Sequence, residues 1–490
     1  MAIAQILLSR LKDKNILPAA GLIGDKWIDR ASDGATFEVI NPSTGEHLAT
    51  LPDFGVVEAK AAIAAADAAQ PAYAALTGKQ RATLMGKFQA LITENLEDLA
   101  IILTAEMGKP IGEARGEVGF SALYVEWSKE EAKRVYGDTI PGHEPDKRII
   151  ILKQPVGVVA AITPWNFPSS MLARKLAPAL ATGCAMISKP AEQTPLSALA
   201  LVRLAERAGI PAGIVGILPS TRAPEIGLEF CTNETVKKIS FTGSTQVGRI
   251  LMRQASAQIK RLSMELGGNA PFIVFDDADL DAAVEGAMIS KFRNNGQTCV
   301  CANRLYVQAG VYDAFAEKLS VAVNKLVVGD GFGEGVTTGP LIDQAAVRKV
   351  EAHLADAVGK GGKITLGGHP KGGQFFEPTI LTGATQQMLI SREETFGPVA
   401  PLFKFDSVDE VIGMANATEF GLAAYFYARD LSRVFKVAEA LDYGMVGVNT
   451  GLITTEVAPF GGVKQSGFGR EGSKYGIEDY LDIKYLCLSV

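Results

Sequence analysis

One cysteine of this chain lies in a segment whose composition suits a nucleophile. Cys299 ends the run 294–299, Asn-Asn-Gly-Gln-Thr-Cys, which predicts a loop. A loop cysteine is accessible to a substrate, and a thiolate is a strong nucleophile. Most cysteines are instead small buried apolar residues. We expect that simpler role for Cys184, Cys231 and Cys487.

Two other segments offer groups that a thiol addition to a carbonyl needs. Glu265 follows Met264 at the end of a predicted strand, where burial raises the pKa of a carboxyl towards the range of a general base. Asn166 lies in 163–168, whose prolines hold it in a loop rather than a helix. Its side-chain amide is a suitable donor to an oxyanion. The sequence thus offers a nucleophile, a base and an oxyanion donor.

A glycine motif near the carboxyl end matches the dinucleotide-binding pattern only in its letters. Residues 467–472 read G-x-G-x-x-G. The functional motif needs a strand before it, a helix after it and an acidic residue about 20 positions further on. Only 18 residues follow Gly472, and they end in a predicted strand. We interpret the motif as a glycine-rich turn.

A better candidate for dinucleotide binding is the segment 241–248, which follows a predicted strand and opens a predicted helix. Gly243 permits a tight turn, while Ser244 and the N–H groups of the helix start can meet a diphosphate. Ordinary helix capping explains such a pattern when it stands alone. Lys189 and Glu192, at the end of another predicted strand, can hydrogen-bond ribose hydroxyls. A solvent-exposed Lys–Glu pair is the common alternative.

Strands alternate with helices over most of the chain, which predicts an α/β fold with parallel sheets covered by helices. Apolar residues at intervals of three and four predict helices within 54–135. One strand–helix alternation precedes Glu265 and another follows it, so we expect two α/β domains with a linker near 262–270. The expected strands are 156–163, 185–188, 214–218, 238–242, 271–275 and 304–308, and the expected helices are 168–182, 195–208, 244–256, 279–291 and 310–326.

The tail, 480–488, alternates apolar with charged residues and therefore predicts a strand. A terminal strand needs a sheet to join. A neighbouring subunit and the edge of a sheet in the same chain are equal candidates.

Bulk composition excludes several classes of function. The formal charge of −6 leaves no basic surface for nucleic acid or anionic lipid, which favours a small-molecule substrate. The longest nearly apolar run, 176–187, is shorter than the ~18 residues of a membrane span, and the first 17 residues lack the order of a secretory signal. We therefore expect a cytoplasmic protein. Five cysteines argue against a disulfide framework, and four histidines, none at ligand spacing, argue against a metal site.

Six motifs, in order along the chain, resemble those of the NAD(P)-dependent aldehyde dehydrogenase superfamily. They are 163–168, 189–192, 241–248, 265–268, 296–299 and 393–398. The resemblance implies the fold of that superfamily. It divides the chain into a Rossmann-like NAD(P)-binding domain (1–129 and 151–262), an α/β catalytic domain (263–472) and a small β oligomerisation element (130–150 and 473–490). It also implies a homodimer or homotetramer.

The resemblance implies a role for each candidate residue. Cys299 carries a thiohemiacetal and then a thioester, Asn166 and the Cys299 N–H hold the oxyanion, and Glu265 activates the water that hydrolyses the thioester. Relatives that pass the acyl group to phosphate or coenzyme A need no such base, so Glu265 favours the free acid as product. The residues implied in cofactor binding are Thr163, Pro164, Trp165, Lys189, Glu192, Gly243, Ser244, Leu266, Glu394 and Phe396.

Two arginines lie close in sequence to the expected site. Arg174 is on the predicted helix after Asn166, and Arg293 lies six residues before Cys299. Guanidinium groups bind carboxylates bidentately, which suits an aldehyde whose far end is a carboxylate. A protein acid as partner is the equal alternative for either arginine.

Segments 292–303 and 460–476 are similar to those of succinate-semialdehyde dehydrogenases. In that group the two matching arginines and a loop serine bind the substrate carboxylate. Thr454 takes the place of the serine, and its extra methyl narrows the pocket. The expected reaction is oxidation of succinate semialdehyde, with glutarate semialdehyde or a general aliphatic aldehyde as alternatives. A non-enzymatic relative is disfavoured because Cys299, Glu265 and Asn166 are all present.

Two further expectations concern the cofactor and redox control. The Glu192 carboxylate accepts a hydrogen bond from a ribose 2′-hydroxyl and repels a 2′-phosphate, so NAD is expected over NADP, with NADP possible. Cys301 lies two residues beyond the nucleophile. The resemblance implies a Cys299–Cys301 disulfide as an off-switch, and a structural thiol is the alternative.

Overall fold

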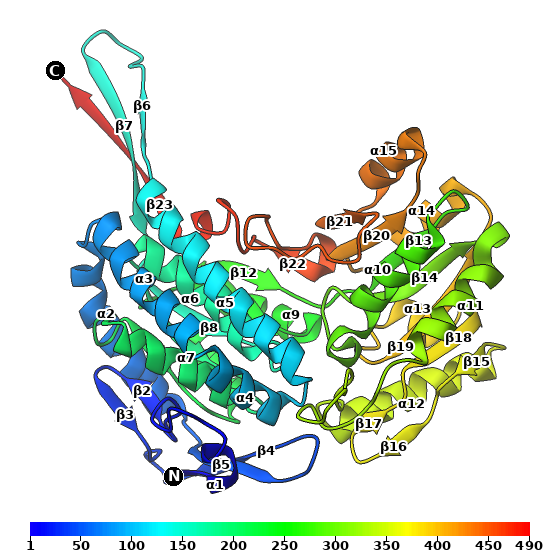
Figure 1. Cartoon of the computed structure of the whole chain (residues 1–490). Helices are drawn as coiled ribbons and strands as arrows, with labels where there is room; N and C mark the ends of the chain where they lie inside the picture. The colour runs from blue at the N-terminus through cyan, green and yellow to red at the C-terminus, as the bar shows by residue number, and fades with distance from the viewer.

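The computed structural model describes residues 1–490 and contains two α/β lobes, one beside the other, with a narrow sheet projecting at one end (Figure 1). Each lobe has its own large sheet, of eight and seven strands. This confirms the expected α/β class. No helix combines the length and the apolar content that crossing a membrane requires.

The sheet of the first lobe has the strand order β22-β12-β11-β8-β9-β10-β2-β3. Its five middle strands run parallel and are largely buried, as strands covered by helices on both faces are. Their bounds are Val158–Ile162 (β8), Ala185–Lys189 (β9), Val215–Ile217 (β10), Val236–Thr242 (β11) and Arg261–Glu265 (β12). The antiparallel edge strands are Gly21–Ile23 (β2), Lys26–Ile28 (β3) and Gly467–Phe468 (β22).

Three connecting helices of this lobe follow the predicted alternation closely, and a fourth, Ala223–Thr232 (α8), was not predicted. The connecting helices are Pro168–Thr182 (α6), Pro195–Arg207 (α7), Ala223–Thr232 (α8) and Thr245–Ala255 (α9). Every residue of α6 is buried, because α5 and α3 cover it. The helical region expected within 54–135 consists of four helices, Val56–Ala74 (α2), Gly78–Glu94 (α3), Leu96–Met107 (α4) and Ile111–Glu131 (α5).

The sheet of the second lobe has the order β15-β18-β19-β14-β13-β20-β21, and six of its strands run parallel. The strands are Lys363–Leu366 (β15), Thr379–Ala384 (β18), Val399–Phe405 (β19), Ala302–Gln308 (β14), Ala270–Val274 (β13), Ala423–Tyr427 (β20) and Met445–Val448 (β21). Its helices are Leu280–Phe292 (α10), Tyr312–Val323 (α11), Gln344–Gly359 (α12), Leu389–Arg392 (α13), Val408–Asn416 (α14) and Leu431–Ala440 (α15).

The connection between the lobes is shorter than the expected linker at 262–270. Strand β12 continues to Glu265 and β13 begins at Ala270, so only 266–269 cross without regular structure. The chain later returns to the first lobe, where β22 pairs antiparallel with β12. Gly467 and Gly469 take φ of +106° and +88° there, and no α-helix follows. The G-x-G-x-x-G run is therefore a glycine-rich turn, as expected.

The projecting sheet consists of Asp138–Ile140 (β6), Lys147–Pro155 (β7) and the tail strand Leu481–Ser489 (β23) (Figure 1). The tail pairs antiparallel with β7 from Leu481 to Ser489, so it joins a sheet of its own chain. Almost all of β23 is exposed, and this includes Cys487. The expectation that Cys487 is buried is wrong, because the projecting sheet has no core beneath this strand.

The remaining elements lie at the periphery. They are Ala2–Ile3 (β1), Gln5–Leu8 (α1), Thr36–Ile40 (β4), His47–Pro52 (β5), Pro370–Gly372 (β16) and Phe375–Phe376 (β17).

Candidate active site

Two cavities meet at Cys299. Both are lined by Cys299, Phe167 and Met171, and their volumes are about 300 and 290 Å³. The first is also lined by Arg174, Arg293, Thr298, Thr454 and Phe460, and the second by Pro164, Trp165, Asn166, Gly243, Ser244, Leu266, Glu394 and Phe396. The candidates for substrate binding and most candidates for cofactor binding therefore lie on opposite sides of one thiol.

The loop that carries Cys299 needs unusual backbone geometry. Asn294 and Asn295 are both left-handed, with φ of +50° and +56°, which asparagine tolerates better than most residues. A Cβ on Gly296 would lie 2.2 Å from the Gly397 carbonyl oxygen, so no larger residue fits there. Burial raises the pKa of the Cys299 thiol to about 12. The thiol is therefore protonated near neutral pH, and its proton must be removed before it attacks.

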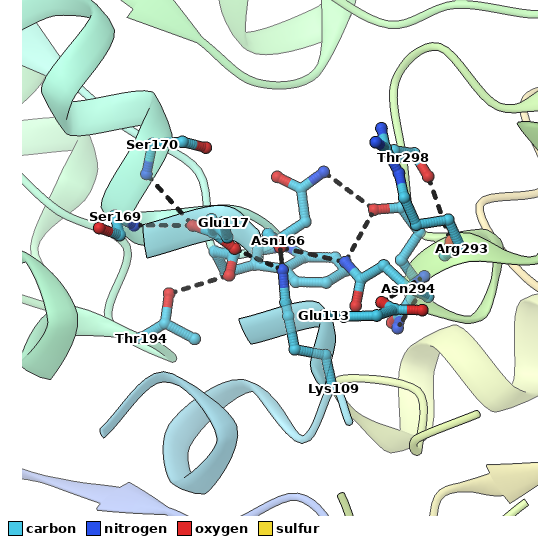
Figure 2. Close-up of polar contacts among 12 residues, drawn as sticks. Lys109, Glu113, Glu117, Asn166, Ser169, Ser170, Thr194, Arg293, Asn294 and Thr298 are labelled. Carbon is cyan, nitrogen blue, oxygen red and sulfur yellow. Dashed lines mark hydrogen bonds and ion pairs between the residues drawn. The ribbon is translucent and has the colours of Figure 1, made fainter. Parts of the chain in front are cut away.

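Asn166 is held at both its main chain and its side chain (Figure 2). Its Nδ2 donates to the Gln297 carbonyl at 3.0 Å. Its own carbonyl accepts from Asn294 Nδ2 at 3.0 Å and from Lys109 Nζ at 2.7 Å. An amide nitrogen carries two N–H groups, so one remains to donate to an oxyanion.

Glu265 ends β12 as a buried carboxyl whose two oxygens have no hydrogen-bond partner. Burial raises its pKa well above the ordinary value, and the nearby Glu471 carboxylate raises it further. Glu265 lines neither cavity, although its charge contributes to the raised pKa of the Cys299 thiol. A carboxyl with a raised pKa suits general acid–base work near neutral pH.

The candidates for diphosphate binding lie at the start of α9. Ser244 is the N-cap of that helix, and its Oγ accepts from the Val247 N–H at 3.3 Å. A Cβ on Gly243 would meet the Phe241 ring, so a larger residue there would displace that ring. The unpaired N–H groups of a helix start attract phosphate.

Glu394 and Phe396 reach the same cavity from the second lobe. Glu394 Oε1 accepts from the Gly268 N–H at 3.2 Å, and burial raises the pKa of this carboxyl to about 7. Phe396 has a left-handed φ of +54° and packs edge-on against Trp165, with ring centroids 5.5 Å apart. An aromatic-walled slot with a carboxylate for ribose hydroxyls fits a nicotinamide dinucleotide.

Lys189 and Glu192 lie outside this cavity, at the carboxyl edge of the first sheet. Lys189 Nζ is 3.1 Å from Glu192 Oε2, and the lysine is buried while the glutamate is partly exposed. Thr163, at the end of the neighbouring strand, donates its N–H to the Lys189 carbonyl at 3.2 Å. Dinucleotides bind at this edge of a parallel sheet, so the pair is close to where an adenosine ribose would lie.

Arg174 has a protein acid as partner, which is the alternative that the sequence left open. Its Nε lies 2.9 Å from Glu471 Oε2, and its guanidinium carbon lies 3.8 Å from the Phe460 ring centroid. Its Nη2 has no hydrogen-bond partner. Arg174 therefore lines the first cavity with one donor nitrogen still unpaired.

Arg293 differs from Arg174 because it forms no ion pair. Its guanidinium carbon lies 5.5 Å from the Phe167 ring centroid, at the first cavity. Thr454 lines the same cavity. A guanidinium that forms no ion pair, in the cavity that contains the thiol, is able to bind an anionic group of a ligand.

Residues 27–486 match the sequence pattern of the Aldehyde dehydrogenase family. The chain belongs to that family. It is 62% identical to the glutarate-semialdehyde dehydrogenase of Pseudomonas putida KT2440, over 98% of this chain and 100% of that protein. It is 59% identical to the NADP-dependent succinate-semialdehyde dehydrogenase of Escherichia coli K12, over 98% and 100% of the two chains. The crystal structure of aldehyde dehydrogenase from Brucella melitensis biovar abortus 2308 superposes with a TM-score of 0.97 at 60% identity, over 98% and 99% of the two chains.

The chain is thus an aldehyde-oxidising enzyme of a family that uses NAD(P). The expected superfamily and fold are confirmed. These two relatives are named for semialdehydes of two lengths, and another, 60% identical over 98% of both chains, is a 3-sulfolactaldehyde dehydrogenase of Pseudomonas putida.

This aldehyde dehydrogenase also contains a buried ionic group that sequence analysis missed. Lys175, next to Arg174 on α6, donates to Thr242 Oγ1 at 2.7 Å and to Glu471 Oε1 at 2.5 Å. These cations lower the pKa of the Glu471 carboxyl. Glu471 belongs to the glycine run that we discarded as a cofactor motif. Two consecutive basic residues inside an otherwise apolar helix were the available signal that an acid lies nearby.

Cys301 of this aldehyde dehydrogenase is buried just before β14 and lines neither cavity. Its Sγ donates to the Lys291 carbonyl at 3.3 Å and lies 3.3 Å from Lys291 Nζ. A bond to Cys299 therefore requires the thiol to leave these contacts.

Proposed function

We propose that this enzyme oxidises a short aldehyde that carries a carboxylate at its far end, with succinate semialdehyde as the first candidate and the free acid as product. The observation that carries this proposal is Arg293, a guanidinium without an ion pair in the cavity that contains Cys299. Arg174 and the Thr454 hydroxyl line the same cavity and add polar contacts. Arg293 is partly buried in this cavity and forms no ion pair, so its guanidinium is available to a substrate carboxylate.

In the proposed reaction the Cys299 thiol gives its proton to solvent water, its sulfur adds to the aldehyde carbon, and the carbonyl oxygen becomes an oxyanion. The free N–H of Asn166 Nδ2 and the Cys299 main-chain N–H hold that oxygen. Glu394 and Phe396 are among the residues of the second cavity that would hold a nicotinamide cofactor, which would supply the hydride acceptor for this carbon. Collapse of the oxyanion then leaves a thioester on Cys299.

Glu265 is proposed as the base for the second half of the reaction. It takes a proton from a water that attacks the thioester carbon, and the acid leaves as Cys299 is released. Its raised pKa supports this role, because a more basic carboxylate removes a proton from water more readily.

Arg293→Ala is expected to lower kcat/KM for succinate semialdehyde by about 10–150-fold, because a hydrogen bond to a charged group contributes ~1.5–3 kcal/mol. Hexanal has no carboxylate and serves as the internal control. Its kcat/KM should stay within about twofold, since uncharged substrates make no such bond. Equal losses for both aldehydes would assign Arg293 a general structural role.

Glutarate semialdehyde, one methylene longer, is the second candidate substrate. The name of the Pseudomonas putida relative favours it, whereas the extra methyl of Thr454 favours the shorter aldehyde. One methylene in a pocket changes the transition-state free energy by ~1–3 kcal/mol. The ratio of kcat/KM for the two semialdehydes therefore distinguishes them.

We also propose NAD as the preferred cofactor, with NADP as a weaker one. Glu192, partly exposed and paired with Lys189, supports this preference because its carboxylate repels a 2′-phosphate. Glu192→Ser is expected to raise kcat/KM with NADP by about tenfold or more, since one like-charge contact of ~1.4 kcal/mol is removed. A wild-type enzyme that prefers NADP would contradict the proposal.

We further propose that the eight-stranded sheet belongs to the NAD(P)-binding domain and the seven-stranded sheet to the catalytic domain. The projecting sheet of β6, β7 and β23 is proposed as an assembly element of a dimer or a dimer of dimers. Its exposed apolar side chains, among them Ile483 and Tyr485, support this assignment.

A further inference from the structure

The loop that carries Asn166 joins β8 to α6 and belongs to no sheet. A buried lysine from a segment distant in sequence donates one of the hydrogen bonds that hold this loop. Lys109, two residues beyond the end of α4, donates from Nζ to the Asn166 carbonyl at 2.7 Å (Figure 2). The only other side chain that donates to that carbonyl is Asn294, at 3.0 Å.

The Lys109 side chain is completely buried. Its ammonium also donates to Glu117 Oε2 at 2.6 Å and lies 3.8 Å from the Phe167 ring centroid. Desolvating an ammonium is costly, and an apolar side chain of similar volume would fill the space without that cost. A lysine at this position does two things that an apolar side chain cannot do: it neutralises Glu117 and it donates to Asn166.

Glu117 fixes the ammonium and the start of α6 together. Its Oε1 accepts from the N–H groups of Ser169 and Ser170 at 3.0 and 3.2 Å. The N-cap residue, Phe167, makes no side-chain cap of its own. Because Glu117 lies on α5, the Asn166 loop is tied to two helices of the first lobe.

The same loop is tied to the segment that carries the nucleophile. Asn294 Nδ2 donates to the carbonyls of both Asn166 and Gln297, at 3.0 and 3.3 Å. Asn166 Nδ2 donates to the same Gln297 carbonyl at 3.0 Å, two residues before Cys299. Removal of Lys109 would leave the Asn166 main-chain carbonyl with one side-chain donor, Asn294. The side-chain amide of Asn166 could then rotate relative to the Cys299 thiol.

We propose that Lys109, held by Glu117, is a positioning residue that sets the Asn166 side chain where the oxyanion of the reacting aldehyde forms. Lys109 lines neither cavity, so it acts through Asn166 rather than on the substrate. This inference rests on the oxyanion role proposed above for Asn166. A displacement of ~1 Å in such a group costs about 10²-fold in rate.

The test compares Lys109→Met with the double variant Lys109→Met/Glu117→Gln. The single variant is expected to form NADH about 10–100-fold more slowly in a single turnover at saturating NAD and aldehyde. Its Tm should fall, because Glu117 loses its counter-ion. The double variant should recover most of the Tm but not the rate. If the rate recovers together with the Tm, Lys109 has only a structural role and the inference is wrong.

One further variant, Asn166→Ala, separates the possible failures. Asn166→Ala should slow NADH formation by about 10²–10³-fold. If it does not, the proposed oxyanion role fails and the inference fails with it. If Asn166→Ala is slow while the double variant keeps the wild-type rate, only the inference fails. A Lys109→Met enzyme with a raised KM and an unchanged single-turnover rate would also overturn it.

Glu106→Gln is the matched control for a buried carboxylate that caps a helix. Glu106 accepts from the N–H groups of Leu196 and Ser197 at the start of α7, at 2.6 and 2.8 Å, and does not contact Asn166. This variant should change the Tm and leave the rate of NADH formation unchanged. A slow Glu106→Gln enzyme would show that any disturbed helix start impairs the reaction, and would overturn the specific role of Lys109.

Discussion

Glu265→Gln is expected to produce an enzyme that forms about one NADH per active site and then nearly stops, because the thioester still forms but is no longer hydrolysed. Glutamine has the size of glutamate and no basic oxygen. The steady-state kcat should fall by about 10²–10⁴-fold, the usual contribution of a positioned base. Rapid mixing with NAD and succinate semialdehyde measures the burst and the steady rate in one experiment.

The pH dependence of kcat follows from the raised pKa of Glu265. A base acts only when it is ionised, and a raised pKa means that a larger part of Glu265 is protonated near neutral pH. The steady-state kcat should therefore rise as the pH rises through the pKa of this group, and the rise should be absent in Glu265→Gln. If the burst slows as much as the steady rate, Glu265 also takes the thiol proton of Cys299. An unchanged kcat would remove Glu265 from the mechanism.

Cys299→Ala is expected to remove both the burst and the turnover, a loss of about 10⁴-fold or more, because no other group forms the covalent adduct. NAD binding should persist, since Cys299 is only one of many residues that line the cofactor cavity. Stopped-flow absorbance measures NADH, and calorimetric titration measures NAD binding. Residual turnover near the wild-type value would disprove the covalent route.

Cys301→Ala is the matched control for this cysteine, because it changes a thiol in the same loop that lines neither cavity. It should keep both the burst and the turnover. The same variant tests the Cys299–Cys301 disulfide that the family resemblance implies as an off-switch. Peroxide should inhibit the wild-type enzyme reversibly, with dithiothreitol restoring activity, and Cys301→Ala should lose that reversible inhibition. If the variant remains reversibly inhibited, Cys301 is a structural thiol.

Local sequence predicts the regular elements well and the boundary between the lobes less well. Helix α6 begins and ends at the predicted residues, 168 and 182, because proline starts it and Gly183 ends it in a left-handed conformation. The expected linker at 262–270 was too long, because β12 continues through Glu265. A run of apolar residues that ends in an acid does not show how far the strand beside it extends. Pairing with that strand decides where β12 ends. The burial of Cys487 was also predicted wrongly from local sequence. Only the fold shows that its sheet projects from the body of the protein.

The residues alone identify a thiol in a loop, a carboxyl at the end of a buried strand and an amide between prolines. The reaction requires a nucleophile, a base and an oxyanion donor. Cys299, Glu265 and Asn166 can therefore be recognised together from residue type and position. Sequence also makes the two arginines candidates for a carboxylate, but it does not separate their roles. Only the tertiary structure distinguishes Arg174, which pairs with Glu471, from Arg293, which forms no ion pair. It alone also brings Lys109 to Asn166. The physical reason is that the charge state and partners of a buried group depend on packing between segments far apart in sequence, and no local pattern encodes that packing.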